Sequence, residues 1–153
     1  MNERSPQVGT LVDEFEFPVD AGKVREFAIA IKDPAPRYRD PAAAAAEGFA
    51  AVPAPLTFAV VAGHYRDAAA AVRLLGLDIG RVVVGEVEWS YERPVLVGDR
   101  LRGRRVVAEV KTREGGRGGV MTLVTLETEL RNQHGDVAVR QREVLIETGK
   151  GGS

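Results

Sequence analysis

The segment KDPAPRYRD, residues 32–40, gathers side chains that could transfer protons. Two carboxylates, Asp33 and Asp40, bracket two prolines, two arginines and Tyr38. Carboxylates and phenols act as general acids or bases when they lie within hydrogen-bond reach of a reacting group. A tyrosine is a far weaker base than a histidine at neutral pH, and this segment contains no histidine. The segment therefore fits a loop that lines a substrate site better than a complete acid–base centre.

Helices on both sides must position this loop. Asp20 can cap a helix that ends before Pro34, because the residue before a proline avoids the α-helical region. An alanine run after Asp40 predicts a short second helix. Residues 55–76 then predict one long, buried helix of about 30 Å that starts at Pro55 and stops at Gly76.

The rest of the chain reads as strands. One strand precedes the helices, and four strands follow them in a predicted meander, with Trp89 and Tyr91 on the core face of the first. This order predicts an α+β fold, an antiparallel sheet with helices on one face. The predicted strands are 8–17, 82–91, 100–112, 120–132 and 137–148.

Composition excludes several classes of function. The net charge of −1 provides no long-range field for nucleic acid. The absence of cysteine excludes disulfides and thiolate metal sites. The most apolar stretch, 42–63, is broken by Glu47 and by prolines, so no membrane span is expected. The opening MNERSPQ lacks a signal pattern, and we expect a cytoplasmic protein with one domain, 1–148, and a tail, 149–153.

Three stretches together resemble the MaoC-like (R)-specific hydratases and dehydratases, which act on (3R)-hydroxyacyl thioesters. They are VREFAIAIKDPAPRYRDPAAA, VPAPLTFAVV and EVEWSYERPVLVGDRL. The resemblance covers about residues 8–147 and is strongest to the short single-domain dehydratase subunits. It implies the hot-dog fold, in which a curved antiparallel sheet wraps a long central helix. It also implies reversible loss of water from a β-hydroxyacyl thioester.

Within the loop, the resemblance assigns roles residue by residue. Asp33 stands at the family's catalytic aspartate, and Tyr38 stands where the catalytic histidine is expected. Lys32 replaces the usual glycine and Ala35 the usual asparagine, while Asp40 matches the closing acid. The family's proton-transfer pair is therefore incomplete in this chain.

At the entry to the predicted long helix, the family's His-Gly pair falls on Ala54 and Pro55. The family glycine donates its backbone N–H to the thioester oxygen, and a proline has no N–H to donate. Leu56 or Thr57 could supply that N–H if the alignment shifts by a residue. The resemblance thus implies a substrate site lined by Asp40, Pro55, Leu56, Thr57 and Phe58, with Asp33 and Tyr38 as weak catalytic candidates and no metal.

We therefore expect a dehydratase subunit that binds the acyl chain of an acyl-ACP or acyl-CoA thioester and relies on a catalytic hot-dog partner. Two alternatives stay open. One is a self-sufficient homodimeric enoyl hydratase that uses Asp33 with Tyr38 or His64, and the other is a non-catalytic acyl-thioester binding module. His64 is expected to be a buried core residue, and Asp67 on the same helix is a weaker thioesterase candidate. No metal, nucleotide or redox cofactor is implied.

Overall fold

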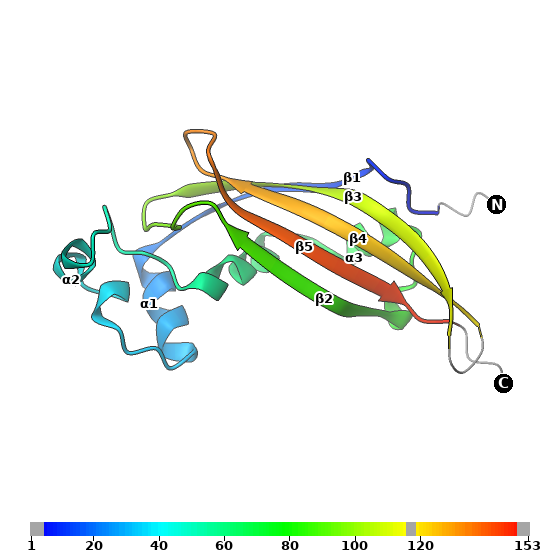
Figure 1. Cartoon of the computed structure of the whole chain (residues 1–153), viewed down its shortest axis with the longest axis horizontal. Helices are drawn as coiled ribbons and strands as arrows, with labels where there is room; N and C mark the ends of the chain where they lie inside the picture. The colour runs from blue at the N-terminus through cyan, green and yellow to red at the C-terminus, as the bar shows by residue number, and fades with distance from the viewer. Residues whose placement is uncertain (1–4, 116–118, 150–153) are drawn as a thin grey trace.

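The computed structural model describes residues 5–115 and 119–149. A curved sheet forms one layer, and the helical segments lie behind it and beyond one of its ends (Figure 1). In chain order the elements are β1 (Leu11–Pro18), α1 (Ala21–Ala30), the 3-10 turn η1 (Pro36–Tyr38), α2 (Pro41–Ala46), the 3-10 helix η2 (Leu56–Tyr65), α3 (Ala68–Leu74), the 3-10 turn η3 (Ile79–Arg81), β2 (Val82–Tyr91), β3 (Arg100–Glu114), β4 (Val120–Arg131) and β5 (Val137–Glu147).

The sheet is antiparallel, and its strand order is β1-β3-β4-β5-β2. The predicted four-strand meander is therefore wrong for β2, which pairs with β5 instead of β3. The connection from β2 to β3 explains the difference, because it crosses the end of the sheet. There the N–H of Ala54 donates to the carbonyl of Val95, and the N–H of Val97 donates to the carbonyl of Val52.

The segment 55–76 forms two helical pieces, so the prediction of one continuous helix is wrong. Arg66 is extended, with φ −131° and ψ 149°, between η2 and α3. Its Nε donates to Asp13 Oδ2 at 2.9 Å, which ties the break to β1. Asp67 then starts the second piece by accepting a hydrogen bond from the N–H of Ala70 at 2.8 Å. Gly76, with φ 69°, follows α3 as expected.

On the inner face of the sheet, an apolar row of cross-strand neighbours is followed by a polar row. One row is apolar: Phe15, Gly103, Leu130, Val139 and Tyr91. The next row, two residues along each strand, we call the polar row: Asp13, Arg105, Thr128, Gln141 and Trp89. The polar row lies between two separate hydrophobic clusters, one around Phe17 and Phe58 and the other around Leu75 and Val107.

Buried charges hold the polar row together. The Arg105 side chain is 6% exposed and forms an ion pair with Glu143 of β5. Asp13, opposite Arg105 on β1, pairs with Arg66 at 2.9 Å. Asp13 Oδ1 and Arg105 Nε are buried without a hydrogen-bond partner. The break between η2 and α3 therefore lies where the sheet carries its buried charges.

The remaining sequence expectations meet mixed outcomes. Trp89 and Tyr91 pack against the first hydrophobic cluster, as predicted. The N–H of Asn132 donates to the carbonyl of Asp136 and closes the turn between β4 and β5. Residues 116–118, between the predicted strands 100–112 and 120–132, and most of the predicted tail, 150–153, lie outside the described residues.

Candidate functional site

The end of α1 positions Asp33. The N–H of Lys32 donates to the carbonyl of Ile29, and the N–H of Asp33 donates to the carbonyl of Ala28. This pair of bonds is a Schellman motif, and it places Lys32 at a left-handed φ of 59°. Asp33 Oδ1 then accepts a hydrogen bond from the N–H of Ala35 at 3.0 Å. The carboxylate of Asp33 is thus engaged by the turn that follows the helix.

Tyr38 lies at the end of η1 with its ring buried. The Arg37 guanidinium lies 4.9 Å from the centroid of this ring, and its Nη2 donates to the Tyr38 hydroxyl at 3.4 Å. Glu47 fixes the other side of Arg37 through an ion pair of 2.8 Å. The hydrogen bond to Glu47, followed by that to Tyr38, raises the pKa of Arg37, so the guanidinium stays charged.

Asp40 caps the next helix. Its Oδ1 accepts a hydrogen bond from the N–H of Ala42 at 2.9 Å, at the start of α2. Side-chain oxygens at this position satisfy one of the free N–H groups of the first helical turn. The two carboxylates of the loop therefore both accept hydrogen bonds from backbone N–H groups two residues ahead.

A largely apolar cleft of about 440 Å³ opens beside Tyr38. Volumes of this size are typical of small-molecule sites. Four of the sequence candidates line it, namely Tyr38, Pro55, Leu56 and Phe58, whereas Asp33, Asp40 and Thr57 do not. The remaining lining residues are Arg37, Phe49, Pro53, Ala54, Ala59, Tyr91, Glu92, Arg93, Pro94 and Val95.

The sequence analysis did not assign the far wall of the cleft, which comes from the end of β2 and the connection after it. The stretch ERPVLVGD, which contributed to the family resemblance, was a signal for these residues. Burial raises the pKa of Tyr91, so its phenol stays protonated at neutral pH. Arg93 forms an ion pair with Asp136 at 2.6 Å, and Glu92 forms one with Arg140 at 3.4 Å.

The lining of this cleft favours binding over proton transfer. Its walls supply apolar surface, two phenols and two arginines, and no histidine lines it among the described residues. Its one carboxylate, Glu92, is held by Arg140. Among the described side chains of the cleft, this ion-paired carboxylate is the one group that could abstract a proton at neutral pH.

His64 is exposed, and the expectation that it is a buried core residue is wrong. It lines a separate hollow of about 320 Å³ with Lys23 and Glu26. This hollow shares no lining residue with the cleft beside Tyr38. Asp67, the weaker thioesterase candidate, is the cap of α3.

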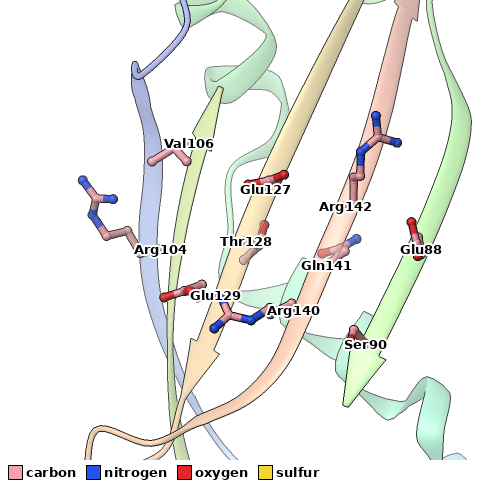
Figure 2. Close-up of a pocket in the computed structure, with 10 residues that line it drawn as sticks. All are labelled: Glu88, Ser90, Arg104, Val106, Glu127, Thr128, Glu129, Arg140, Gln141 and Arg142. Carbon is pink, nitrogen blue, oxygen red and sulfur yellow. Dashed lines mark hydrogen bonds and ion pairs between the residues drawn. The ribbon is translucent and has the colours of Figure 1, made fainter. Parts of the chain in front are cut away.

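A second groove, of about 340 Å³, crosses the outer face of the sheet (Figure 2). Figure 2 shows Glu129 and Arg140 close together on neighbouring strands, and the two form an ion pair. Burial alone would raise the pKa of Glu129, but hydrogen bonds from Arg131 and Arg140 outweigh it and lower the pKa. Glu129 thus stays ionised, which makes this groove a charged sheet surface and a poor site for a general acid.

Among residues 5–115 and 119–149, no group of three or more potential metal ligands comes together. No helix in this part of the chain is long and apolar enough to span a bilayer.

Comparisons with known proteins agree with this architecture. Residues 6–141 match the family model described as FAS1-like, dehydratase domain region. A UPF0336 protein of Saccharopolyspora erythraea is 39% identical over 134 residues, covering 87% of this chain and 83% of the relative.

Solved structures show the same fold. The C-terminally truncated HadBC (3R-hydroxyacyl-ACP dehydratase) complex from Mycobacterium tuberculosis matches with a TM-score of 0.76 and 26% identity, covering 94% of this chain and 98% of that chain. An (R)-hydratase from A. caviae involved in PHA biosynthesis matches with a TM-score of 0.68 and 24% identity, covering 93% and 97%. The predicted α+β hot-dog fold is confirmed, apart from the continuity of its central helix.

Proposed function

The chain belongs to the family of FAS1-like dehydratase domain regions, and on this premise we propose that it is a subunit of a (3R)-hydroxyacyl-thioester dehydratase or enoyl hydratase. In this proposal the cleft beside Tyr38 binds the acyl part of the substrate. A second hot-dog chain supplies the proton transfers. The protein works in the cytoplasm on an acyl-ACP or acyl-CoA thioester, with no metal or organic cofactor.

One observation carries the proposal. The cleft is apolar and large enough for a ligand. The resemblance puts Tyr38 at the position of the catalytic histidine, and among the described residues the one carboxylate that lines the cleft, Glu92, is ion-paired. General acid–base catalysis is worth about 10²- to 10⁴-fold, and an unassisted phenol would forfeit most of that gain at neutral pH. A chain of this kind can hold a substrate but needs a partner to turn it over. The HadBC dehydratase, whose solved structure is a complex, supports a heteromeric arrangement.

The start of η2 also supports a chain that binds the substrate while a partner transfers the protons. Pro55 is the cap of η2 and has no N–H, and the first N–H donated within this segment, from Phe58, goes to the carbonyl of Pro55 at 2.9 Å. Leu56 and Thr57 are exposed at the start of η2 and are the residues whose N–H groups remain for a thioester oxygen. We propose Leu56 for this role, because it also lines the cleft.

The test combines binding and turnover on the purified chain. We expect the isolated protein to bind crotonyl-CoA and longer acyl-CoA thioesters while it hydrates crotonyl-CoA no faster than background. A hot-dog partner with intact Asp and His, encoded beside this chain, should restore hydration. Rapid hydration by the isolated chain that is lost in Asp33→Asn would instead establish the homodimeric enzyme. Binding without turnover in the presence of such a partner would establish a binding module.

A matched pair of variants localises the binding site. Leu56 is 69% exposed and lines the cleft, whereas Val60 is 58% exposed on the same segment and does not. Leu56→Glu places a charge at the apolar mouth, so it should weaken acyl-CoA binding at least tenfold, about 1.4 kcal/mol. Val60→Glu should leave binding unchanged. Equal effects of the two substitutions would remove the cleft from consideration.

A further inference from the structure

Arg37 holds the hydroxyl of Tyr38 from one side. A hydroxyl has one hydrogen to donate and lone pairs with which to accept, whereas a guanidinium can only donate. The bond from Arg37 Nη2 at 3.4 Å therefore uses a lone pair of Tyr38 and leaves its hydrogen free. Both residues line the cleft, and within the described part of the chain no group accepts that hydrogen. The hydroxyl of Tyr38 is thus an available donor on the cleft wall.

Glu47 keeps Arg37 in this orientation. It lies 2.8 Å from Nη1 of Arg37, while Nη2 of the same guanidinium reaches the hydroxyl of Tyr38. Because the guanidinium is planar and its donors form a rigid fork, fixing one nitrogen also fixes the other. The Arg37 and Glu47 side chains are 34% and 43% exposed, so the ion pair itself adds little stability. Its main effect is to orient the hydroxyl of Tyr38.

The charges of the cleft are already matched by the protein. Three charged side chains line it, namely Arg37, Glu92 and Arg93. Each forms an ion pair, with Glu47, Arg140 and Asp136 respectively. A carboxylate on the ligand would therefore have to compete with an existing partner for either arginine. The lining favours a ligand that is apolar along its length and carries a neutral oxygen.

A hydroxyacyl thioester carries two oxygens that need partners in such a cleft. The proposed function gives the thioester oxygen to the N–H of Leu56. The hydroxyl on the chain remains, and burying it in apolar surroundings without a hydrogen bond is unfavourable. Tyr38 is the lining phenol that a cation orients, whereas Tyr91, the other phenol, has no cation against its ring within the described residues.

We propose that Tyr38, positioned by Arg37 and Glu47, donates its hydrogen to the hydroxyl oxygen of the acyl chain, so that the cleft prefers hydroxyacyl over unoxygenated acyl thioesters. This inference rests on the proposed function, because it concerns the ligand of the same cleft. Tyr38 then selects the substrate by its oxygen, as a donor, and needs no ability to accept a proton.

Isothermal titration calorimetry of the isolated chain with two thioesters of equal chain length tests the preference. The protein should bind (3R)-3-hydroxybutyryl-CoA about three- to tenfold more tightly than butyryl-CoA, the range expected from one hydrogen bond. Tyr38→Phe should abolish or reverse this ratio, because the ligand hydroxyl then lies buried without a donor. Arg37→Met should reduce the ratio while Tyr38 is still present, since the hydroxyl is no longer held. Succinyl-CoA should bind no more tightly than butyryl-CoA.

Tyr65 provides the matched control. Lys23 lies 4.8 Å from its ring centroid and donates to its hydroxyl, so Tyr65 is a second tyrosine held by a cation. It does not line the cleft. Tyr65→Phe should therefore leave the ratio of the two affinities unchanged. The ratio is the informative readout, because a general disturbance of the fold weakens both ligands together.

The outcomes separate this inference from the proposed function. Equal binding of the two thioesters by the wild type would overturn the role of Tyr38 and leave the acyl site standing. A preference that persists in Tyr38→Phe but is lost in Tyr91→Phe would overturn it as well. Tighter binding of succinyl-CoA would show that the arginines recognise an anion. Absence of binding by every thioester would overturn the proposed function and this inference with it.

Discussion

Lys32 occupies the same place at the end of α1 that Gly48 occupies at the end of α2. Both follow the helix cap in a Schellman motif, with φ of 59° for Lys32 and 90° for Gly48. At α2 the N–H of Gly48 donates to the carbonyl of Ala45, and the N–H of Phe49 donates to that of Ala44. Two equivalent turns therefore differ in whether their left-handed residue is glycine.

This difference predicts opposite effects of two substitutions. A side chain in the left-handed region costs about 1–2 kcal/mol, partly offset by the greater chain entropy of glycine. Lys32→Gly should raise the free energy of unfolding by about 0.5–1 kcal/mol in urea denaturation. Gly48→Ala should lower it by about 1 kcal/mol, although a Cβ at Gly48 would meet nothing within 4 Å. A loss of stability in Lys32→Gly would show that the lysine side chain has another role.

Asp33 is predicted to act through its turn. Asparagine retains the side-chain oxygen that accepts the N–H of Ala35, so Asp33→Asn should leave the unfolding midpoint nearly unchanged. Asp33→Ala should cost about 1 kcal/mol, because it removes that hydrogen bond. The same two proteins, combined with a catalytic partner, should hydrate crotonyl-CoA at the wild-type rate per folded molecule. A rate loss confined to a stable Asp33→Asn protein would make Asp33 catalytic.

The buried Arg105–Glu143 ion pair predicts that removing one partner lowers the free energy of unfolding much more than removing both. Arg105→Met leaves Glu143 buried without its partner and should lower the free energy of unfolding by about 3–5 kcal/mol. Arg105→Met/Glu143→Met should recover most of that loss, because apolar replacement of both buried charges is often neutral. Arg104→Met breaks the exposed pair with Glu14 and should cost less than about 1 kcal/mol. Additive losses in the double variant would contradict this account.

Glu129 predicts an acid-dependent contribution to stability. Its pKa in the folded protein lies below the ordinary glutamate value of 4.5, because hydrogen bonds from Arg131 and Arg140 outweigh the effect of burial. The unfolded chain then binds a proton before the folded one does. The stabilisation is complete above about pH 4.5 and is lost as the pH falls through the lower folded value.

Thermal unfolding of Glu129→Gln tests this dependence. The variant should melt below the wild type at pH 7, and the two melting temperatures should converge as the solution is acidified. Glu127→Gln is the control, since Glu127 lies on the same face of β4 and makes no ion pair within the described part of the chain. A gap between wild type and Glu129→Gln that persists in acid would mean that the charge of Glu129 is not its cause.

The alternation of apolar and polar residues along the strands was the main indication of the fold in the sequence. Alternation placed β2 within the bounds Val82–Tyr91, and it put Trp89 and Tyr91 on the core face. It could not show that β2 skips past β3, because strand order depends on contacts between residues far apart in the chain. Nor could it show that three valines of this strand, Val83, Val84 and Val87, would be 52%, 57% and 41% exposed.

The helical region was harder to read, for local reasons. The apolar run before Arg66 looks like the first half of a buried helix, but its valines, Thr57 and Gly63 are weak helix formers. The sequence analysis placed Asp67 within one continuous helix as a weak thioesterase candidate, although aspartate at the start of an alanine run is a capping signal. Of the candidates taken from the loop and the helix entry, Tyr38, Leu56 and Phe58 line the cleft, together with Pro55. The sequence did not identify Tyr91 or Val95, which reach the cleft only through the sheet.

The polar row separates the two hydrophobic clusters of the protein's interior. Side chains two positions apart on a strand are separated by about 7 Å, so Trp89 follows directly behind Tyr91 along the inner face. Under the proposed function, a hydrocarbon tail held in the cleft beside Tyr91 faces the first hydrophobic cluster. Extending it past Trp89 would require stripping Arg105 and Asp13 of the polar surroundings that make their burial tolerable. In this proposal, the buried charges of the polar row limit how deep an acyl chain can reach. The second hydrophobic cluster, on the other side of that row, is filled by the protein's own side chains.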